Sequence, residues 1–236
     1  MEGSKDYSDL TLIIPTFNEV GNVRTITKLI KKMYKNAKII FADDGSTDGT
    51  REAIITLSKM YKGVSLLDRS NEKVHGLAIS VMSAAMLADT KYIIVIDADM
   101  QHPLSKIKPI YKKLKTNDIV IGVRSYVREW GWYRRVISKG MAFLAFLIFK
   151  IRRKHTCNDM MSGFFGIKAS VFKEIIKKNW HSFVGTGYKV LLDILRLGDK
   201  SLKIGEVKYN TFHPRKSGKS KFKFRIMIDT LKSTLR

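Results

Sequence analysis

The sequence has little cysteine and lacks a long apolar run. Its single cysteine, Cys157, excludes an intrachain disulfide framework and fits a reducing compartment. The longest apolar run, residues 141–149, is much shorter than the roughly 20 residues that a membrane-spanning helix needs. The first residues are polar and charged, unlike a secretory signal peptide. These absences argue against a disulfide-stabilised secreted module, and they predict no transmembrane helix within these 236 residues.

Acidic residues are also scarce relative to basic ones. The chain carries 44 Lys and Arg against 21 Asp and Glu, which gives a formal net charge of +23. Such an excess indicates an anionic partner: nucleic acid, anionic lipid headgroups or a phosphorylated small molecule. A hydrophobic content of 44% is ordinary for a globular protein and excludes wholesale disorder.

The first half of the chain alternates between segments typical of strands and segments typical of helices. Because parallel strands need such crossovers, the pattern predicts an α/β fold with a mostly parallel, doubly wound sheet. No internal repeat or low-complexity linker divides the chain, so one catalytic-type domain is expected to cover most of it. Strands are predicted at residues 10–14, 38–42, 64–67, 92–96 and 118–121, and helices at about 23–33, 53–60, 76–88 and 105–115.

The most informative segment is the apolar strand 92–96 and the acidic loop that follows it. Asp97 and Asp99 end this strand with a single alanine between them, and Gln101 follows shortly after. Ligands of open α/β sheets bind at the carboxyl ends of parallel strands. Two neighbouring carboxylates repel each other unless a cation lies between them, and hard oxygen ligands favour Mg²⁺ or Mn²⁺. A divalent-metal site for a diphosphate is therefore favoured over a merely polar loop, and we expect Asp99 to be exposed.

Two further polar loops end the first two predicted strands. Residues 15–19 read Pro-Thr-Phe-Asn-Glu, and residues 43–50 read Asp-Asp-Gly-Ser-Thr-Asp-Gly-Thr. In the second loop a carboxylate is suited to read a base or ribose, and Ser46 or Thr47 is expected to cap the next helix. Asn18 and Glu19 are equally consistent with simple helix-start roles. Three acidic loops ending three strands of one sheet are expected to converge on one crevice, whereas His75 and His102 are expected to be loop residues, not metal ligands.

Two basic segments carry apolar stripes. One covers about residues 134–152, and the other, residues 222–236, places Phe224, Met227, Ile228, Leu231 and Leu235 on one helical face. Basic residues beside an apolar face are typical of helices at a membrane interface, although a core-facing amphipathic helix gives the same pattern. The sequence leaves open whether membrane-spanning helices follow Arg236.

The three loops, in this order, resemble those of family 2 glycosyltransferases. Several later segments resemble those of the dolichyl-phosphate (polyprenyl-phosphate) mannose synthases within that family. They are Gly122–Arg124, residues 132–140, residues 159–164, Gly187-Tyr188, residues 204–207 and Arg215 through Lys221. The resemblance runs from about Leu10 to Lys221 and implies a GT-A-type nucleotide-diphospho-sugar fold. It therefore implies a catalytic domain over residues 1–221 and a separate amphipathic C-terminal helix over 222–236.

The resemblance also implies roles for individual residues. The positions that match nucleotide-sugar contacts are Pro15, Phe17, Glu19, Ala42, Asp44, Asp97, Ala98, Asp99, Arg124, Arg215 and Lys221. Asp97, Asp99 and Gln101 match the site for Mg²⁺ or Mn²⁺. Arg134 and Ser138 match contacts to the acceptor phosphate, so the residues expected to act in catalysis are Asp97, Asp99, Arg124, Arg134 and Ser138.

The function implied by the resemblance is inverting transfer of mannose from GDP-mannose to dolichyl or polyprenyl phosphate. The enzyme would be membrane-associated, at an anionic surface, with its catalytic domain on the cytoplasmic face. Relatives that use UDP-glucose or another UDP-sugar share most of these motifs, so sugar identity stays open. A basic nucleic-acid-binding protein is the alternative from another class, but the basic residues cluster around apolar runs and no specific nucleic-acid partner is expected.

Overall fold

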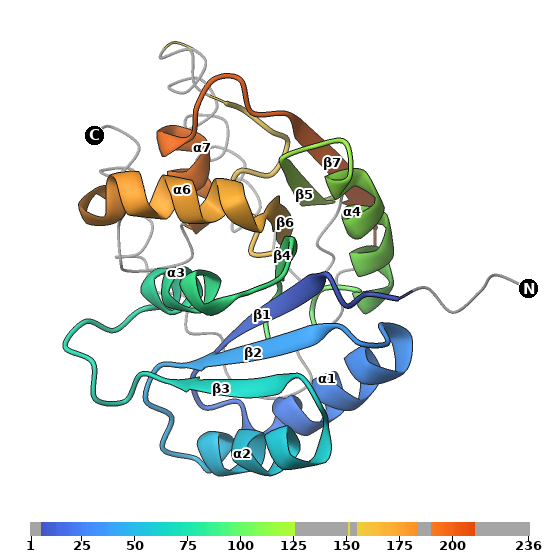
Figure 1. Ribbon diagram of the computed structural model, residues 1–236, viewed down its shortest axis with the longest axis vertical. Helices are drawn as coiled ribbons and strands as arrows, with labels where there is room; N and C mark the ends of the chain where they lie inside the picture. The colour runs from blue at the N-terminus through green and yellow to red at the C-terminus, as the bar shows by residue number, and fades with distance from the viewer. Residues whose placement is uncertain (1–5, 126–150, 152–154, 184–189, 211–236) are drawn as a thin grey trace, which may run out of the picture.

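The computed structural model describes residues 6–125, 151, 155–183 and 190–210. Its centre is a seven-stranded sheet in the order β3-β2-β1-β4-β6-β5-β7 (Figure 1). The strands are β1 Leu10–Thr16, β2 Lys38–Asp43, β3 Val64–Asp68, β4 Tyr92–Val95, β5 Ile119–Arg124, β6 Phe165–Lys168 and β7 Ile204–Tyr209. All strand pairs are parallel except those made by β6, which is antiparallel to both β4 and β5. The predicted doubly wound, mostly parallel sheet is confirmed.

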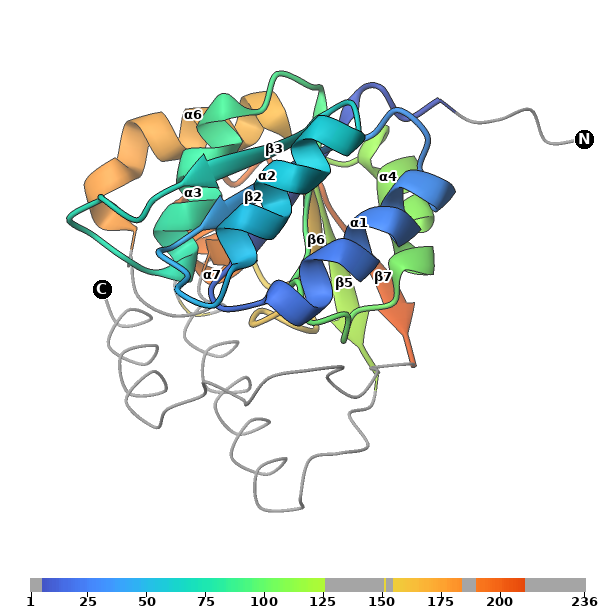
Figure 2. The same ribbon diagram turned by 90° about the horizontal axis from the view of Figure 1, so that it is seen from below.

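Helices cover both faces of the sheet (Figures 1 and 2). They are α1 Val20–Met33, α2 Thr50–Met60, α3 Leu77–Leu87, α4 Ile107–Leu114, α6 Ala169–Asn179 and α7 Val190–Leu197, with 3₁₀ turns η1 Leu104–Lys106 and η2 Trp180–Ser182. One apolar cluster joins α1, α2 and α4 to the sheet, and a second joins α3, α6 and α7 to it. Alternate residues of β1 feed the two clusters, with Leu12 in the first and Ile13 in the second, because successive side chains of a strand point to opposite faces.

The central strands are mostly apolar because both of their faces are buried. Every residue of β1 and of β4 is buried. Helix α1, in contrast, buries mainly one stripe, which includes Val23, Ile26 and Ile30. This difference explains why continuous apolar runs marked the strands and helical spacing marked the helices.

The antiparallel strand β6 was not predicted from the sequence. It lies between β4 and β5, so a segment more than forty residues after β5 separates these two strands in the sheet. Gly166 is required there because a Cβ atom at this position would lie 2.7 Å from Cγ2 of Ile110 on α4. A short apolar segment with glycine carries too weak a pattern to reveal such a position.

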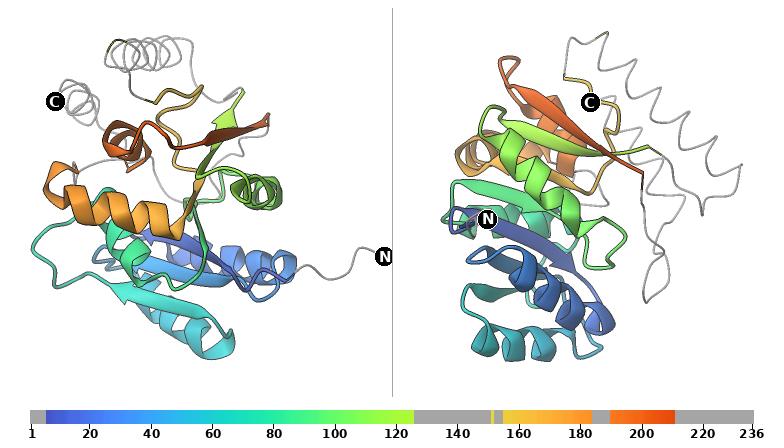
Figure 3. Two further views of the ribbon diagram at one scale, coloured as in Figure 1. Left: turned by 45° about the horizontal axis from the view of Figure 1, so that its top comes forward. Right: turned by 90° about the vertical axis from the view of Figure 1, so that its right-hand side faces the viewer.

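The strand order places a topological switch point beside β1. From β1 the chain adds β2 and β3 on one side, and then places β4 on the other side of β1. The loops that follow β1 and β4 therefore leave neighbouring strands in opposite directions, which opens a crevice at the carboxyl edge of an α/β sheet. Figure 3 shows the strands of the sheet and the helices around them from two further directions.

The basic amphipathic segments predicted at about 134–152 and 222–236 lie outside the described residues, apart from Ile151, which is 73% exposed. Among the helices that the structure describes, none combines the length and the apolar character needed to cross a bilayer.

Candidate active site

The loops after β1 and β2 are joined by hydrogen bonds between their backbones and side chains. The backbone N–H of Asn18 donates to Oγ of Ser46 at 2.8 Å, and that of Glu19 donates to Oγ1 of Thr50 at 2.8 Å. Each of these hydroxyls in turn donates to an aspartate of its own loop, Ser46 to Asp43 and Thr50 to Asp48. The two loops therefore form one rigid wall of the crevice.

The expectation that Ser46 or Thr47 caps helix α2 is wrong. The helix begins at Thr50, after Gly49 in a left-handed conformation with φ of +91°. The Thr50 N–H donates to the side chain of Asp48 at 3.1 Å. Ser46 lies too far before the helix and bonds to Asp43 instead, because the tight turn at Gly49 separates it from the first helical residue.

Asp43 and Asp44 at the end of β2 have different environments. Asp43 is fully buried, and its carboxylate accepts hydrogen bonds from the backbone N–H groups of Gly45 and Ser46 and from the hydroxyls of Thr16 and Ser46. It is therefore a structural residue that shapes the loop, whereas the sequence suggested that it lines the crevice.

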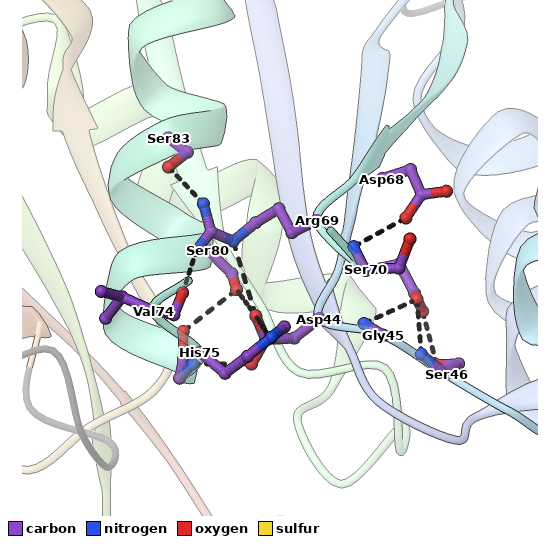
Figure 4. Close-up of polar contacts among 12 residues, drawn as sticks. Asp44, Gly45, Ser46, Asp68, Arg69, Ser70, Val74, His75, Ser80 and Ser83 are labelled. Atoms are coloured by element: carbon purple, nitrogen blue, oxygen red, sulfur yellow. Dashed lines mark hydrogen bonds and ion pairs between the residues drawn. The ribbon is translucent and has the colours of Figure 1, made fainter. Parts of the chain in front are cut away.

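Asp44 contacts the segment that joins β3 to α3 (Figure 4). Its Oδ2 accepts from the backbone N–H of Gly76 at 2.6 Å, while Oδ1 lies 3.2 Å from Nδ1 of His75 and 3.5 Å from Nε of Arg69. Ser80 places its hydroxyl 3.2 Å from the same Oδ1. His75 is a loop residue as expected, but it has a defined role in holding Asp44. This predicted base- and ribose-reading carboxylate is thus fixed in place by the protein.

The loop after β4 carries the predicted metal ligands. Asp97 is partly exposed, with 23% of its side chain accessible, and a Cβ atom added to Gly163 would lie 3.0 Å from its Oδ2. Asp99 accepts the backbone N–H of Gln101 at 3.1 Å. Met100, between them, adopts a left-handed conformation with φ of +61°, which is unfavourable for a side chain of this kind. Strained backbone of this type is concentrated at functional sites.

The expectation that Asp99 is exposed is wrong, because the residue is only 4% exposed. The turn at Met100 folds the chain back so that the Asp99 carboxylate accepts a hydrogen bond from its own loop. A short Asp-Ala-Asp segment does not reveal such a turn, since methionine rarely adopts a positive φ.

His102 differs most from its expected role as an ordinary loop residue. It is 3% exposed, its Nδ1 lies 2.7 Å from the Tyr209 hydroxyl, and its Nε2 lies 3.3 Å from Oδ2 of Asp97. It therefore connects the last strand of the sheet to the predicted metal site. No spacing in the sequence pairs residues 102 and 209.

Arg124, at the end of β5, forms a bidentate ion pair with Asp159. Its Nε lies 2.7 Å from one carboxylate oxygen and its Nη2 lies 2.8 Å from the other. Burial alone would lower the pKa of Arg124, but the hydrogen bonds and charge of Asp159 raise it above the ordinary value, with a smaller contribution from Asp97. Asp159 was absent from the predicted site, although it begins the Asp-Met-Met-Ser-Gly segment that carried part of the resemblance.

The remaining predicted site residues differ in how far they are exposed to solvent. Pro15 and Ala42 are buried register partners on β1 and β2, and Ala98 is also buried. Phe17 is 44% exposed, and Glu19 accepts a hydrogen bond from the Asn22 side chain at 2.7 Å. Any ligand contact of the buried three would come from their backbone. Four predicted residues, Arg134, Ser138, Arg215 and Lys221, lie outside the described residues.

The residues of the acidic loop after β4 fit a site in which Mg²⁺ or Mn²⁺ would be bound jointly by the protein and by a diphosphate. Within the described residues no group of three or more His, Cys, Asp or Glu side chains is arranged to hold a metal ion alone. Mg²⁺ commonly uses one or two carboxylates plus substrate phosphates and waters. The two aspartates and the Gln101 amide form such an oxygen donor set, and Gly163 leaves the space beside Asp97 clear.

Comparison with known proteins agrees with this geometry. Residues 11–176 match the family described as Glycosyl transferase family 2, and the chain belongs to this family. It is an α/β enzyme of the glycosyltransferase class, as predicted.

Three curated relatives carry the name dolichol-phosphate mannosyltransferase. The protein from Saccharomyces cerevisiae is 29% identical over 94% of this chain and 84% of its own length, and that from Mycosarcoma maydis is 30% identical over 94% and 76%. The protein from Pyrococcus furiosus is 33% identical over 96% of this chain and 63% of its own length. The resemblance read from the sequence motifs is thus confirmed.

Solved structures support the GT-A-like fold. A glucosyl-3-phosphoglycerate synthase from Mycobacterium tuberculosis, in complex with Mn²⁺, UDP-glucose and phosphoglyceric acid, aligns with a TM-score of 0.66 at 15% identity, over 96% of this chain and 78% of that one. Mannosyl-3-phosphoglycerate synthase from Rubrobacter xylanophilus aligns with a TM-score of 0.66 at 14% identity, over 95% and 72%. At these identities the likeness concerns the fold.

Proposed function

We propose that this protein transfers mannose from GDP-mannose to dolichyl or a related polyprenyl phosphate, with inversion at the anomeric carbon. The observation that carries the proposal is the Asp97–Gln101 loop at the switch point of the sheet, in a chain whose relatives across nearly its full length are named dolichol-phosphate mannosyltransferases.

In the proposed reaction, an oxygen of the acceptor phosphate forms a bond to C1 of mannose. The bond between C1 and the GDP β-phosphate oxygen breaks, and GDP leaves with the electron pair. The acceptor is a phosphate monoester that is largely ionised near neutral pH, so a strong general base is not required. The chain's task is therefore to position two anionic groups against their mutual repulsion.

Asp97, Asp99 and Gln101 would hold Mg²⁺ or Mn²⁺, which would neutralise the negative charge developing on the leaving diphosphate. The fold neighbour crystallised with Mn²⁺ and UDP-glucose supports a divalent metal in this fold. The rigid wall formed by the first two loops supports a nucleotide-binding role for Phe17, Glu19 and Asp44.

Arg124 would act as a phosphate clamp whose orientation is fixed by Asp159. A guanidinium held by one carboxylate keeps its plane fixed, which favours directional recognition of a phosphate. Arg134 and Ser138 at the acceptor, and Arg215 and Lys221 at the donor phosphates, remain predictions from the resemblance.

We further propose that the protein works at an anionic membrane surface, with its catalytic domain on the cytoplasmic face. The net charge of +23 supports attraction to anionic headgroups, and a polyprenyl acceptor requires access to a bilayer. The division into a catalytic domain over 1–221 and an amphipathic helix over 222–236 belongs to this proposal.

The test is transfer of radiolabelled sugar to dolichyl phosphate in detergent, offering GDP-mannose and UDP-glucose separately with Mn²⁺ or with EDTA. We expect transfer from GDP-mannose that depends on Mn²⁺, and loss of transfer in Asp97→Asn. Asp89→Asn is the matched control, because Asp89 lies on the surface and pairs with Lys38. Transfer from UDP-glucose alone would overturn the donor, and absence of transfer from both would overturn the reaction.

A further inference from the structure

We propose that Tyr209 and His102 form a chain of polar contacts that positions Asp97 for cation binding, so that a tyrosine on the edge strand β7 tunes the metal site. This inference rests on the proposed function in one respect, namely that Asp97 binds the divalent cation. Tyr209 and His102 are positioning residues in this scheme, since they act through Asp97.

The geometry is that of a continuous chain of contacts. The Tyr209 hydroxyl lies 2.7 Å from Nδ1 of His102, and Nε2 of the same ring lies 3.3 Å from Oδ2 of Asp97. Tyr209 and His102 are buried, at 2% and 3% exposure, whereas Asp97 keeps 23% of its side chain exposed. The series of contacts therefore begins at a buried tyrosine and ends at Asp97, the one of the three side chains that a ligand can reach.

Aromatic packing fixes the imidazole ring. Phe164 lies beside His102 with 5.3 Å between ring centroids and beside Tyr209 with 6.0 Å. Phe164 and Tyr209 belong to the same apolar cluster. A ring held in this way keeps both of its nitrogen atoms aimed at their partners.

The chemistry of the three groups determines which atom is the donor in each of the two contacts. An ionised carboxylate only accepts, so Nε2 of His102 carries a hydrogen and donates to Asp97. In the tautomer that carries its hydrogen on Nε2, the other ring nitrogen, Nδ1, is an acceptor. Nδ1 then accepts from the Tyr209 hydroxyl. Burial raises the pKa of Tyr209, so this hydroxyl keeps its proton and remains a donor.

A purely structural role would not require this order of donors. Metal-binding carboxylates are commonly held by hydrogen bonds from outer-shell groups, and loss of such a partner typically costs about 10- to 100-fold in metal affinity or activity. His102 holds Asp97 on one side, and the absence of a side chain at Gly163 leaves the other approach to Oδ2 uncrowded. We infer that the chain restricts rotation of the Asp97 carboxylate before the cation arrives.

The experiment compares two tyrosine variants of the full chain. Tyr209→Phe removes the hydroxyl and keeps the ring. Tyr111→Phe is the matched control, because Tyr111 is also buried, at 4% exposure, and its hydroxyl donates to Asp9 at 2.7 Å, just before the amino end of β1 and so at the opposite edge of the sheet from the site. The Mn²⁺ dissociation constant is measured by calorimetry in the presence of GDP, alongside the melting temperature of each variant.

We expect both tyrosine variants to melt at similarly lowered temperatures, but only Tyr209→Phe to weaken Mn²⁺ binding, by about ten-fold. His102→Leu should weaken it by at least as much. His102→Gln should recover part of the loss, because the glutamine amide nitrogen can replace Nε2 as the donor to Asp97. Unchanged Mn²⁺ affinity in Tyr209→Phe, or an equal loss in Tyr111→Phe, would overturn the inference.

A spectroscopic measurement on the metal-free protein tests the bond directions without any activity. Long-range ¹H–¹⁵N NMR correlations report which ring nitrogen carries the proton, and His102→Gln identifies the signal by its disappearance. The Nε2–H tautomer is expected, and the Nδ1–H tautomer would contradict the proposal.

The failure of this inference is distinguishable from failure of the proposed function. If Asp97→Asn abolishes Mn²⁺ binding but the wild-type protein transfers no sugar, the proposed reaction is wrong and the positioning role of Tyr209 and His102 stands. If Asp97→Asn leaves Mn²⁺ affinity unchanged, the cation is bound elsewhere and the inference is overturned.

Discussion

The loops after β2 and β4 carry similar acidic sequences but use their carboxylates differently. After β2, Asp43 is fully buried and bonded to its own loop, and Asp44 is held by the segment before α3. After β4, Asp97 stays partly exposed beside Gly163, and it is contacted by a buried histidine. In the first loop the buried Asp43 shapes the loop, while in the second loop Asp97 keeps a partly exposed carboxylate.

The difference arises from the neighbours of each loop. The β2 loop has hydroxyl and amide donors in its own sequence, because Gly45 and Ser46 follow directly. Asp97 contacts His102, five residues later in its own loop, and lies beside Gly163, which is far along the chain and has no side chain to cover it. Asp43, surrounded by local donors, is structural, whereas Asp97 keeps a partly exposed carboxylate that is available for chemistry.

The strongest test of this contrast is Asp97→Asn. Loss of a carboxylate that binds the metal should lower sugar transfer by at least about 10³-fold, equivalent to about 4 kcal/mol of transition-state stabilisation. Folding stability should be nearly unchanged because the side chain is partly exposed. Steady-state transfer assays and urea unfolding measure the two effects. A variant that keeps its activity would show that the comparison is wrong.

A second test narrows the space beside Asp97. Gly163→Ala adds a Cβ atom at 3.0 Å from Oδ2 of Asp97, so the carboxylate must shift. We expect transfer to fall by about 10-fold, since a displacement of 1 Å can cost about 10²-fold and the carboxylate must shift by less than that. The dissociation constant for Mn²⁺ with GDP should rise in parallel. An unchanged constant would mean that the position of this oxygen is not critical.

For Asp43→Asn in the loop after β2 we expect the opposite pattern, in which the substitution lowers folding stability. The substitution replaces an acceptor oxygen by an NH₂ donor that faces the Ser46 and Thr16 donors, so unfolding free energy should fall by about 2 kcal/mol. Equilibrium urea unfolding at pH 7 provides the measurement, with Asp89→Asn as the control. Full stability combined with lost activity would reverse the roles assigned to the two loops.

The smallest expected effect is on folding stability and concerns Asp118, which lies outside both loops. Burial alone would raise the pKa of Asp118, but hydrogen bonds from the Lys168 side chain and the Lys203 backbone outweigh it and hold the pKa below its ordinary value. A lowered folded-state pKa stabilises the protein above the unfolded pKa of about 3.9, and this stabilisation disappears as the pH falls through the lower folded value.

Asp118→Asn should therefore cost about 1 kcal/mol of unfolding free energy at pH 7, and the difference from wild type should shrink below about pH 4. Urea unfolding across pH 3–7 measures it. A difference that is constant with pH would mean that the carboxylate contributes through its shape and not through its charge.

Much of the fold was readable from local patterns. The strands β1 to β4 and the helices α1 to α3 were predicted within a few residues, because their apolar runs and helical stripes are strong. The antiparallel β6 was missed because four residues with a glycine give a weak signal. The candidate metal loop was identified because its acidic pair directly follows a buried strand.

The sequence by itself determined the α/β class, the family and the positions of the acidic loops, since these depend on patterns that lie within a few residues of each other. The tertiary structure decided which carboxylates serve the loops and which face the crevice. It alone brought Asp159 to Arg124 and Tyr209 to His102. Such pairs are separated by tens to more than a hundred residues, and only the order of strands in the sheet brings them within hydrogen-bonding distance.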